Sequence, residues 1–211
     1  MAMKTGATLA VLALSAATLA AAPVSVSAAT QALTPSGVTV WPNSDNQDWS
    51  LGWEFSLSSP TTVTGLGYNN YGFNSDHTVG IYNSAGTLLA SAVVTGSSTL
   101  IGDYRYDTGL SLKLAAGDYY VVATTLGLND GWIYQASSWS TEPSVSYLGS
   151  YYAAGAGGHL AFPDLSATSR QYFEANFLTA IPEVSTWAML AAGFVGLGLA
   201  GRRRRVRTDL A

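Results

Sequence analysis

The chain has 211 residues, of which 48% are hydrophobic and 10% are charged, and its formal net charge is −4. It contains no cysteine, which excludes disulfides, thiol catalysis and cysteine-ligated zinc. Between residues 29 and 181, eleven acidic residues stand against three basic ones, a net charge of −8 for this segment. That balance argues against nucleic acid as a partner.

The first 28 residues have the features of a secretory signal peptide. Lys4 precedes an apolar run of mostly small residues over 7–22, and small residues follow at the positions that signal peptidase requires. We therefore expect signal peptidase to cleave near Ala28 or Ala29 and the rest of the chain to cross the inner membrane. The alternative is a buried, alanine-rich helix.

Residues 29–180 predict one extracytoplasmic, all-β domain. In the segment 48–57, apolar residues alternate with polar ones and with glycine from Trp49 to Leu57, which is typical of a half-buried strand. Helical periodicity is absent from this part of the sequence. Further strands are predicted at 77–82, 87–94, 110–114, 119–125, 131–136, 159–162 and 171–178. A total of about eight to ten short strands favours an antiparallel β-sandwich.

Turn-forming residues separate these runs. Asn83-Ser84-Ala85-Gly86 predicts a hairpin between the strands on either side, and the sequence around Asp130 predicts a turn. The Gly- and Ala-rich segment 151–158 predicts a flexible loop.

No catalytic motif is present in the sequence. We expect His77 to be a strand-end residue bonded to its neighbours, and Glu54 and Glu174 to point to solvent from strands. A serine–histidine–aspartate triad assembled from distant residues remains open, but no serine is marked as its nucleophile. We therefore expect the chain not to be an enzyme.

One polar loop is a weak candidate for calcium. Asn43, Asp45, Asn46 and Asp48 place oxygen donors close together, and calcium takes six to eight oxygen ligands. The spacing is not that of an EF-hand, and similar turns are common without metal. No cofactor is otherwise indicated.

Aromatic residues are the candidates for ligand binding. Trp132, Tyr134 and Trp139 lie with Tyr147, Tyr151 and Tyr152 in one part of the chain, close to Asn, Asp and Ser. Exposed rings among such residues can stack on sugars. The alternative is that most of these rings fill the core of the sandwich or cover its edge.

The C-terminal residues 181–211 predict a single transmembrane helix. The eighteen residues 184–201 are uncharged and would span roughly 27 Å as a helix, close to the thickness of a bilayer core. In this helix (about 185–201) we expect Gly196 to lie on the face that packs against another helix. Trp187 is expected at the outer end, and Arg202, Arg203, Arg204 and Arg205 at the cytoplasmic end. The arginine cluster at 202–207 would stay in the cytoplasm, which leaves the body outside.

This tail resembles the PEP-CTERM sorting signal of Gram-negative bacteria. In that family a Pro-Glu-Pro motif, a short transmembrane helix and an arginine cluster follow one another. Pro182 and Glu183 match the motif, whereas Val184 stands where the family has its second proline. The resemblance implies processing by exosortase and a place in the cell envelope or biofilm matrix. The alternative is a plain stop-transfer anchor that keeps the protein in the inner membrane.

The body is also similar to an uncharacterised β-sandwich family of exported surface proteins. "LGWEFSL", "TVTGLGYNNYG", "HTVGIYNSAGTLLASA" and "LAAGDYYVVAT" carry this resemblance. Together the two resemblances imply a cell-surface or matrix protein with a non-catalytic structural or adhesive domain. The alternative function is an exopolysaccharide-binding module, which calcium would assist.

Overall fold

The computed structural model describes residues 29–42, 47–127, 130–154 and 157–180, which form thirteen strands. Among these residues no helix is long and apolar enough to cross a membrane; the predicted span at 185–201 lies outside them. The strands are β1 (Ala29–Gln31), β2 (Leu33–Pro42), β3 (Trp49–Leu57), β4 (Thr61–Asn69), β5 (His77–Asn83), β6 (Leu88–Val94), β7 (Thr99–Ile101), β8 (Tyr104–Leu114), β9 (Gly117–Thr125), β10 (Gly131–Thr141), β11 (Val145–Ala154), β12 (Leu165–Ala167) and β13 (Ala175–Ala180).

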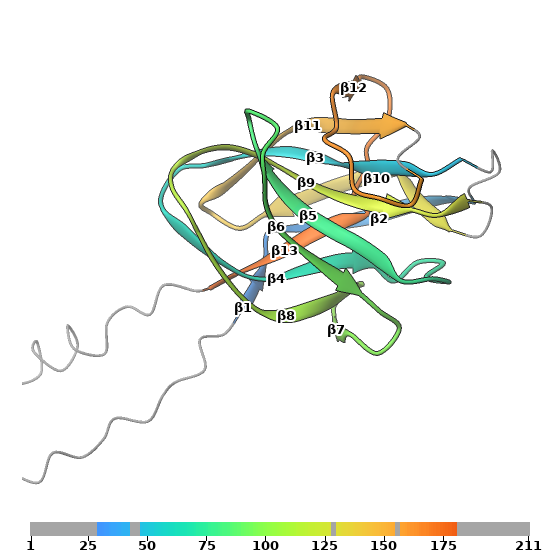
Figure 1. Cartoon of the computed structure of the whole chain (residues 1–211), viewed down its shortest axis with the longest axis horizontal. Coiled ribbons are helices and arrows are strands. Elements are labelled where there is room, and N and C mark those ends of the chain that lie inside the picture. Colours follow the sequence, from blue (N-terminus) through green and yellow to red (C-terminus); the bar gives the residue numbers. More distant parts are fainter. Residues whose placement is uncertain (1–28, 43–46, 128–129, 155–156, 181–211) are drawn as a thin grey trace, which may run out of the picture.

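The strands build two layered sheets and one two-stranded ribbon (Figure 1). One sheet has the order β1-β13-β4-β8-β7, the other has the order β12-β11-β3-β9-β5-β6, and β2 pairs with β10 in the ribbon. Every pairing is antiparallel. The predicted all-β, antiparallel sandwich is therefore confirmed, but the predicted eight to ten strands are too few, since the thirteen include the three-residue strands β1, β7 and β12 and long strands that the sequence did not reveal.

The first and last described strands lie together at one end of the domain. β1 pairs with β13, and Ala29 stands opposite Ala180 (Figure 1). Ala180 also lines a small cavity with Ser59 and Thr61, residues that directly follow the C-terminal end of β3. The opposite end of β3, at Trp49, is roughly 26 Å away for a strand of this length.

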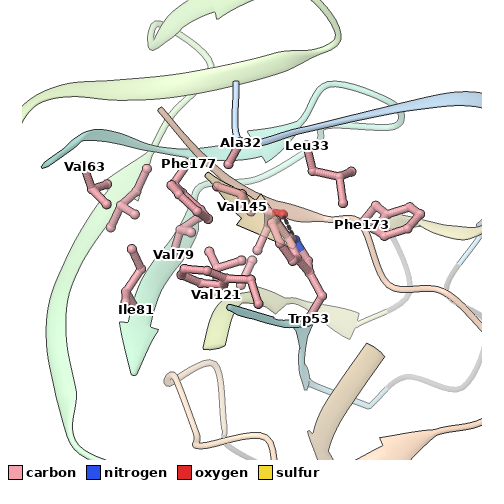
Figure 2. Packing of buried hydrophobic residues seen from close by; sticks show 14 of the residues in the cluster. Ala32, Leu33, Trp53, Val63, Val79, Ile81, Val121, Val145, Phe173 and Phe177 are labelled. Carbon is pink, nitrogen blue, oxygen red and sulfur yellow. Dashed lines mark hydrogen bonds between the residues drawn. The ribbon is translucent and has the colours of Figure 1, made fainter. Parts of the chain in front are cut away.

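The core lies between the two sheets and is rich in aromatic rings (Figure 2). Trp53 of β3 stacks on Phe177 of β13 with ring centroids 5.8 Å apart, and Phe55 lies 4.6 Å from the same ring. The Trp53 indole N–H donates to the Ala175 carbonyl oxygen at 2.7 Å (Figure 2). The alternation predicted for this strand is confirmed, because Leu51, Trp53, Phe55 and Leu57 are all buried.

A segment of the chain covers part of the outer face of the six-stranded sheet, which corrects one predicted strand. Residues 159–162 are not a strand but cross this face. The Ala161 N–H donates to the Ser50 hydroxyl at 2.9 Å, so Ser50 is buried although it lies on the polar side of its strand. The Phe162 ring packs 5.1 Å from Tyr120 and 5.7 Å from Tyr82.

Three further corrections concern irregular segments. The predicted loop at 151–158 is wrong over its first half, since β11 runs to Ala154 and pairs with β3. The strand predicted at 171–178 begins only at Ala175 and runs on to Ala180. The long strands β2, β4 and β11 were not predicted, because glycine, proline and serine interrupt their alternation.

Candidate functional site

Six aromatic side chains form a continuous band across strands that are distant in sequence. In order of contact they are Trp41 of β2, Tyr134 and Trp132 of β10, Tyr172, Tyr152 of β11 and Trp49 of β3. Successive ring centroids are 5.7, 6.3, 5.4, 6.0 and 5.9 Å apart. We call this set the aromatic band. Such distances are typical of favourable aromatic pairs.

Four of the six rings line a pocket of about 420 Å³. Its wall is apolar on the side of β3 and β10, where Trp49, Leu51 and Trp132 lie, and carries hydroxyl groups on the side of β12 and the segment that follows it. The complete lining is Trp49, Leu51, Trp132, Tyr152, Ser166, Ala167, Thr168, Ser169, Arg170 and Tyr172. An apolar wall facing a few polar groups is the usual composition of a small-molecule site.

The local structure of β10 explains why its rings point into the band. Ile133 is fully buried in the core, so its neighbours Trp132 and Tyr134 project to the other side of the strand. A β-bulge between Ile133 and Gln135 leaves Tyr134 without a partner residue on β2. Trp132 stands directly opposite Trp41, which brings the two tryptophans to the same face.

Hydrogen bonds fix the segment that closes the pocket. The Gln171 N–H donates to the Tyr134 carbonyl oxygen at 3.2 Å, and the Gln171 side-chain oxygen accepts from the Ala136 N–H at 2.8 Å. The Tyr172 N–H donates to the Ser150 hydroxyl at 2.8 Å. The segment is thus bonded to both β10 and β11, and the pocket wall is pre-formed.

Arg170 lies over the band. Its guanidinium carbon is 5.6 Å from the centroid of the Trp132 ring and 5.2 Å from that of Tyr134, a cation–π geometry. Burial raises the pKa of the Tyr172 hydroxyl, and the neighbouring Arg170 partly opposes that shift. The side chain of Arg170 is exposed, so its charge is available to a ligand in the pocket.

The structure brings together two of the three ligand candidates predicted from the sequence. Trp132 and Tyr134 are both in the aromatic band, and Trp132 lines the pocket. Trp139 lies apart from it: its ring packs 5.2 Å from Tyr147 and 5.7 Å from Phe173, and 40% of the side chain is exposed. Part of the alternative prediction is also correct, because Tyr147 packs against the core.

Sequence analysis missed Trp41, Trp49, Arg170 and Tyr172 as members of this site. Trp49 was assigned only to the buried face of its strand. The other three join the site through pairings between distant segments, such as β2 with β10. No spacing of residues along the sequence predicts those pairings.

A second cluster of polar side chains is buried near the N-terminal end of β5. His77 is the first residue of β5, as predicted, but its side chain is fully buried and its Nδ1 lies 2.7 Å from the carbonyl oxygen of Thr124, which is not a sequence neighbour. Nδ1 therefore carries a proton and donates. Nε2 faces Asp130 Oδ1 at 3.7 Å. Burial lowers the pKa of His77, which keeps the ring neutral.

The geometry of this cluster fits a role in holding two segments of the fold together. Asp130 accepts hydrogen bonds from the Ser75 hydroxyl at 3.0 Å and from the Leu126 N–H at 2.6 Å. The carboxylate therefore ties the segment after β9 to the segment before β5. The Ser75 hydroxyl is directed to Asp130 and not to His77, so the three residues are not arranged as a nucleophile with its base.

The prediction that Glu174 points to solvent is wrong. Its side chain is completely buried, and neither carboxyl oxygen has a hydrogen bond of good geometry to a described residue. Burial raises the pKa of Glu174 to about 8, although the backbone N–H groups of Glu174 and Ile133 act in the opposite direction. Glu54 is half-buried and not fully exposed.

Two groups of predicted site residues lie wholly or mostly outside the described residues. In the candidate calcium loop only Asp48 is described, half-buried, whereas Asp45 is not. Among described residues there is no group of three or more His, Cys, Asp or Glu side chains that could hold a metal. The predicted sorting and membrane residues also lie outside the described residues: Pro182, Glu183 and Val184 of the motif, and Trp187, Gly196 and Arg202 to Arg205.

Comparison with known proteins gives a family for most of the chain. No curated protein and no solved structure matches it significantly. Residues 35–174, which include every residue of the aromatic band, match the sequence profile described as "Domain of unknown function (DUF4082)". The chain therefore belongs to the DUF4082 family.

Proposed function

We propose that this chain is an exported surface or matrix protein whose β-sandwich is a non-catalytic adhesive module that binds polysaccharide at the aromatic band. The observation that carries the proposal is the pocket of about 420 Å³ between Trp49, Trp132 and Tyr172, with serine and threonine hydroxyls on its far side. Ring faces bind the apolar C–H faces of sugars, and hydroxyl groups fix their orientation.

The continuity of the band supports a chain-like ligand. Trp41 lies beyond the pocket, contacts Tyr134 and has half of its side chain exposed. Rings therefore extend from the pocket onto the open surface of the β2–β10 ribbon. A polymer held in the pocket would continue along these rings, whereas a small isolated ligand would not need them.

The position of the band in the fold suits a displayed domain. The described strands start and end at Ala29 and Ala180, which are paired at one end of the sandwich. The pocket includes Trp49, at the other end of β3. A protein tethered beyond Ala180 would hold its pocket away from the point of attachment.

The terminal sequences support the exported part of the proposal. Residues 1–28 have the pattern of a signal peptide, and residues 181–211 resemble the PEP-CTERM signal that exosortase processes. Signal peptidase and exosortase are the proposed processing enzymes, and the inner membrane is a transient location before the cell surface. Permanent anchoring in the inner membrane is the alternative.

Binding of envelope polysaccharide by the purified domain tests the proposed function. Isothermal titration of polysaccharide extracted from the source cells is expected to give saturable heat with the wild-type protein. Trp41→Ala and Trp132→Ala should each weaken binding, and Trp139→Ala is the matched control because it removes a comparably exposed tryptophan outside the band. Absence of binding by the wild type at millimolar sugar would overturn the proposal.

Calcium remains a subsidiary part of this proposal. The polar loop 43–48 is its candidate site, with Asp48 the described acidic member. Thermal unfolding in calcium and in EDTA tests it. A higher unfolding temperature in calcium that Asp48→Asn abolishes would support the loop as the site, and equal temperatures would count against it.

A further inference from the structure

We propose that the pocket selects an acidic sugar, with the guanidinium of Arg170 binding a carboxylate carried by the polysaccharide. This inference rests on the proposed function and narrows its ligand class. It follows from the single positive charge in a pocket that is otherwise built from rings and hydroxyl groups.

No acidic side chain competes for Arg170 in the pocket. The lining residues include no aspartate or glutamate, and among the described residues no carboxylate lies within salt-bridge distance of Arg170. The guanidinium lies over the rings of Trp132 and Tyr134 and makes one hydrogen bond to the Tyr172 hydroxyl, and its other N–H groups form a planar fork for a ligand. That planar fork matches the two oxygens of a carboxylate.

The other arginine of the body shows the contrast. The Nε of Arg105 donates to Asn70 Oδ1 at 2.7 Å, and its Nη1 donates to the carbonyl oxygens of Gly96 and Ser98 at 2.7 and 3.3 Å. Arg105 is thus used to join loops of the domain. Within the described residues Arg170 makes no comparable set of bonds to backbone oxygens. Its hydrogen bond goes to the hydroxyl of Tyr172, which lines the pocket, so most of its donors do not hold loops together.

The charge of the whole domain limits which acidic polymers fit. Residues 29–181 carry a net charge of −8, which repels a densely charged polyanion over a distance of about 10 Å at ordinary salt. One carboxylate among neutral sugars would meet Arg170 without that penalty. We therefore expect a preference for heteropolysaccharides with spaced uronic acids over polymers made only of uronic acids.

Chemical reduction of the carboxylates provides a direct test. Polysaccharide extracted from the source cells is used as prepared and after its carboxylates are reduced to hydroxymethyl groups, and both forms are titrated into the wild-type protein. The untreated polymer should bind about 10-fold more tightly, as one charge-assisted contact implies. Arg170→Gln should lower affinity for the untreated polymer by the same factor and remove the preference.

Two further variants make the result specific. Arg170→Lys keeps the charge but loses the fork and should retain only part of the preference, whereas Lys113→Gln removes an exposed charge on β8 outside the pocket and should retain all of it. Equal affinity of the wild type for both forms would overturn the inference and leave the proposed function standing. Failure to bind either form would overturn both.

Discussion

The imidazole of His77 lies face to face with the phenol ring of Tyr68, with ring centroids 3.6 Å apart and an angle of 3° between the planes. Phe73 closes the edge of the pair at 5.1 Å from His77. Tyr68 and His77 are both buried, and burial raises the pKa of Tyr68 well above its usual value while it lowers that of His77. Both rings are therefore neutral in the folded protein, and their stacking depends on that state.

The first prediction concerns His77 and acid. Because the pKa of His77 in the folded state is below its unfolded value of 6.5, the unfolded chain binds the proton more readily. The contribution of this residue to stability is thus complete above pH 6.5 and decreases as the pH falls below that value. His77→Gln should remove this dependence, at a cost of about 1–3 kcal/mol at pH 7.5 from the lost stacking and hydrogen bond.

The measurement is urea unfolding of wild type and His77→Gln at pH 5.5 and 7.5. The difference in unfolding free energy between the two proteins should be smaller at pH 5.5. Using this difference removes the contributions of other groups, above all that of Glu174, which has the opposite sign. A difference independent of pH would mean that the pKa of His77 is the same in the folded and unfolded protein, and a larger difference at pH 5.5 would mean that folding raises it.

The second prediction concerns Glu174 and base. Its pKa is raised from 4.5 to about 8, so the folded protein keeps a proton that the unfolded chain releases above pH 4.5. The stabilising contribution is complete below pH 4.5 and is lost as the pH rises to about 8, with a slope of at most about 1.4 kcal/mol per pH unit. Glu174→Gln, neutral at every pH, should be the more stable protein at pH 8.

Urea unfolding between pH 5 and 8.5 tests this directly. The wild type should lose stability relative to Glu174→Gln across that range. Glu174→Asp is the control, because it keeps a carboxyl group at this buried position and should retain the loss of stability at high pH. Parallel curves for wild type and Glu174→Gln would show that Glu174 is ionised in the fold.

The third prediction concerns close packing of β3 on β9. A Cβ atom on Gly52 would lie 1.9 Å from the Val121 carbonyl oxygen, a backbone atom that cannot move aside without disturbing the ladder. Gly52→Ala should therefore destabilise the domain by at least about 2 kcal/mol. At Gly96 a Cβ would meet nothing within 4 Å, so Gly96→Ala is the matched control, and equal melting temperatures for the two variants would contradict the prediction.

How much the sequence predicts depends on whether a feature is local. The alternation from Trp49 to Leu57 predicts β3 and its buried face because both follow from the period of one strand. Glu174 was misplaced for the same reason: the run "QYFEANFL" suggests a strand through residue 174, whereas β13 begins at Ala175. Only the surrounding fold determines that the Glu174 side chain enters the interior.

The aromatic band shows the corresponding limit for function. Composition was sufficient to select Trp132 and Tyr134, since rings near polar residues are candidates for sugar binding. By the same criterion Trp139 was selected as a sugar-binding candidate, but the structure places its ring against Tyr147 and Phe173, outside the band. Arg170 reaches Trp132 through the bonding of Gln171 to β10, a contact between segments that no local pattern encodes.

The fourth prediction concerns the tail and follows from the proposed sorting. Intact mass and cell fractionation of the protein from its source cells should show loss of the residues beyond about Pro182, with the body in the outer envelope or the medium. Replacing Arg202 to Arg205 with alanine should leave the tail uncut, because these charges are the expected stop-transfer signal. Val184→Pro restores the family motif and should be processed at least as fully as the wild type. Full-length protein retained in the inner membrane would instead identify the tail as a permanent anchor. The tail that follows Ala180 would then keep the domain at the inner membrane, and the aromatic band would not be displayed at the cell surface.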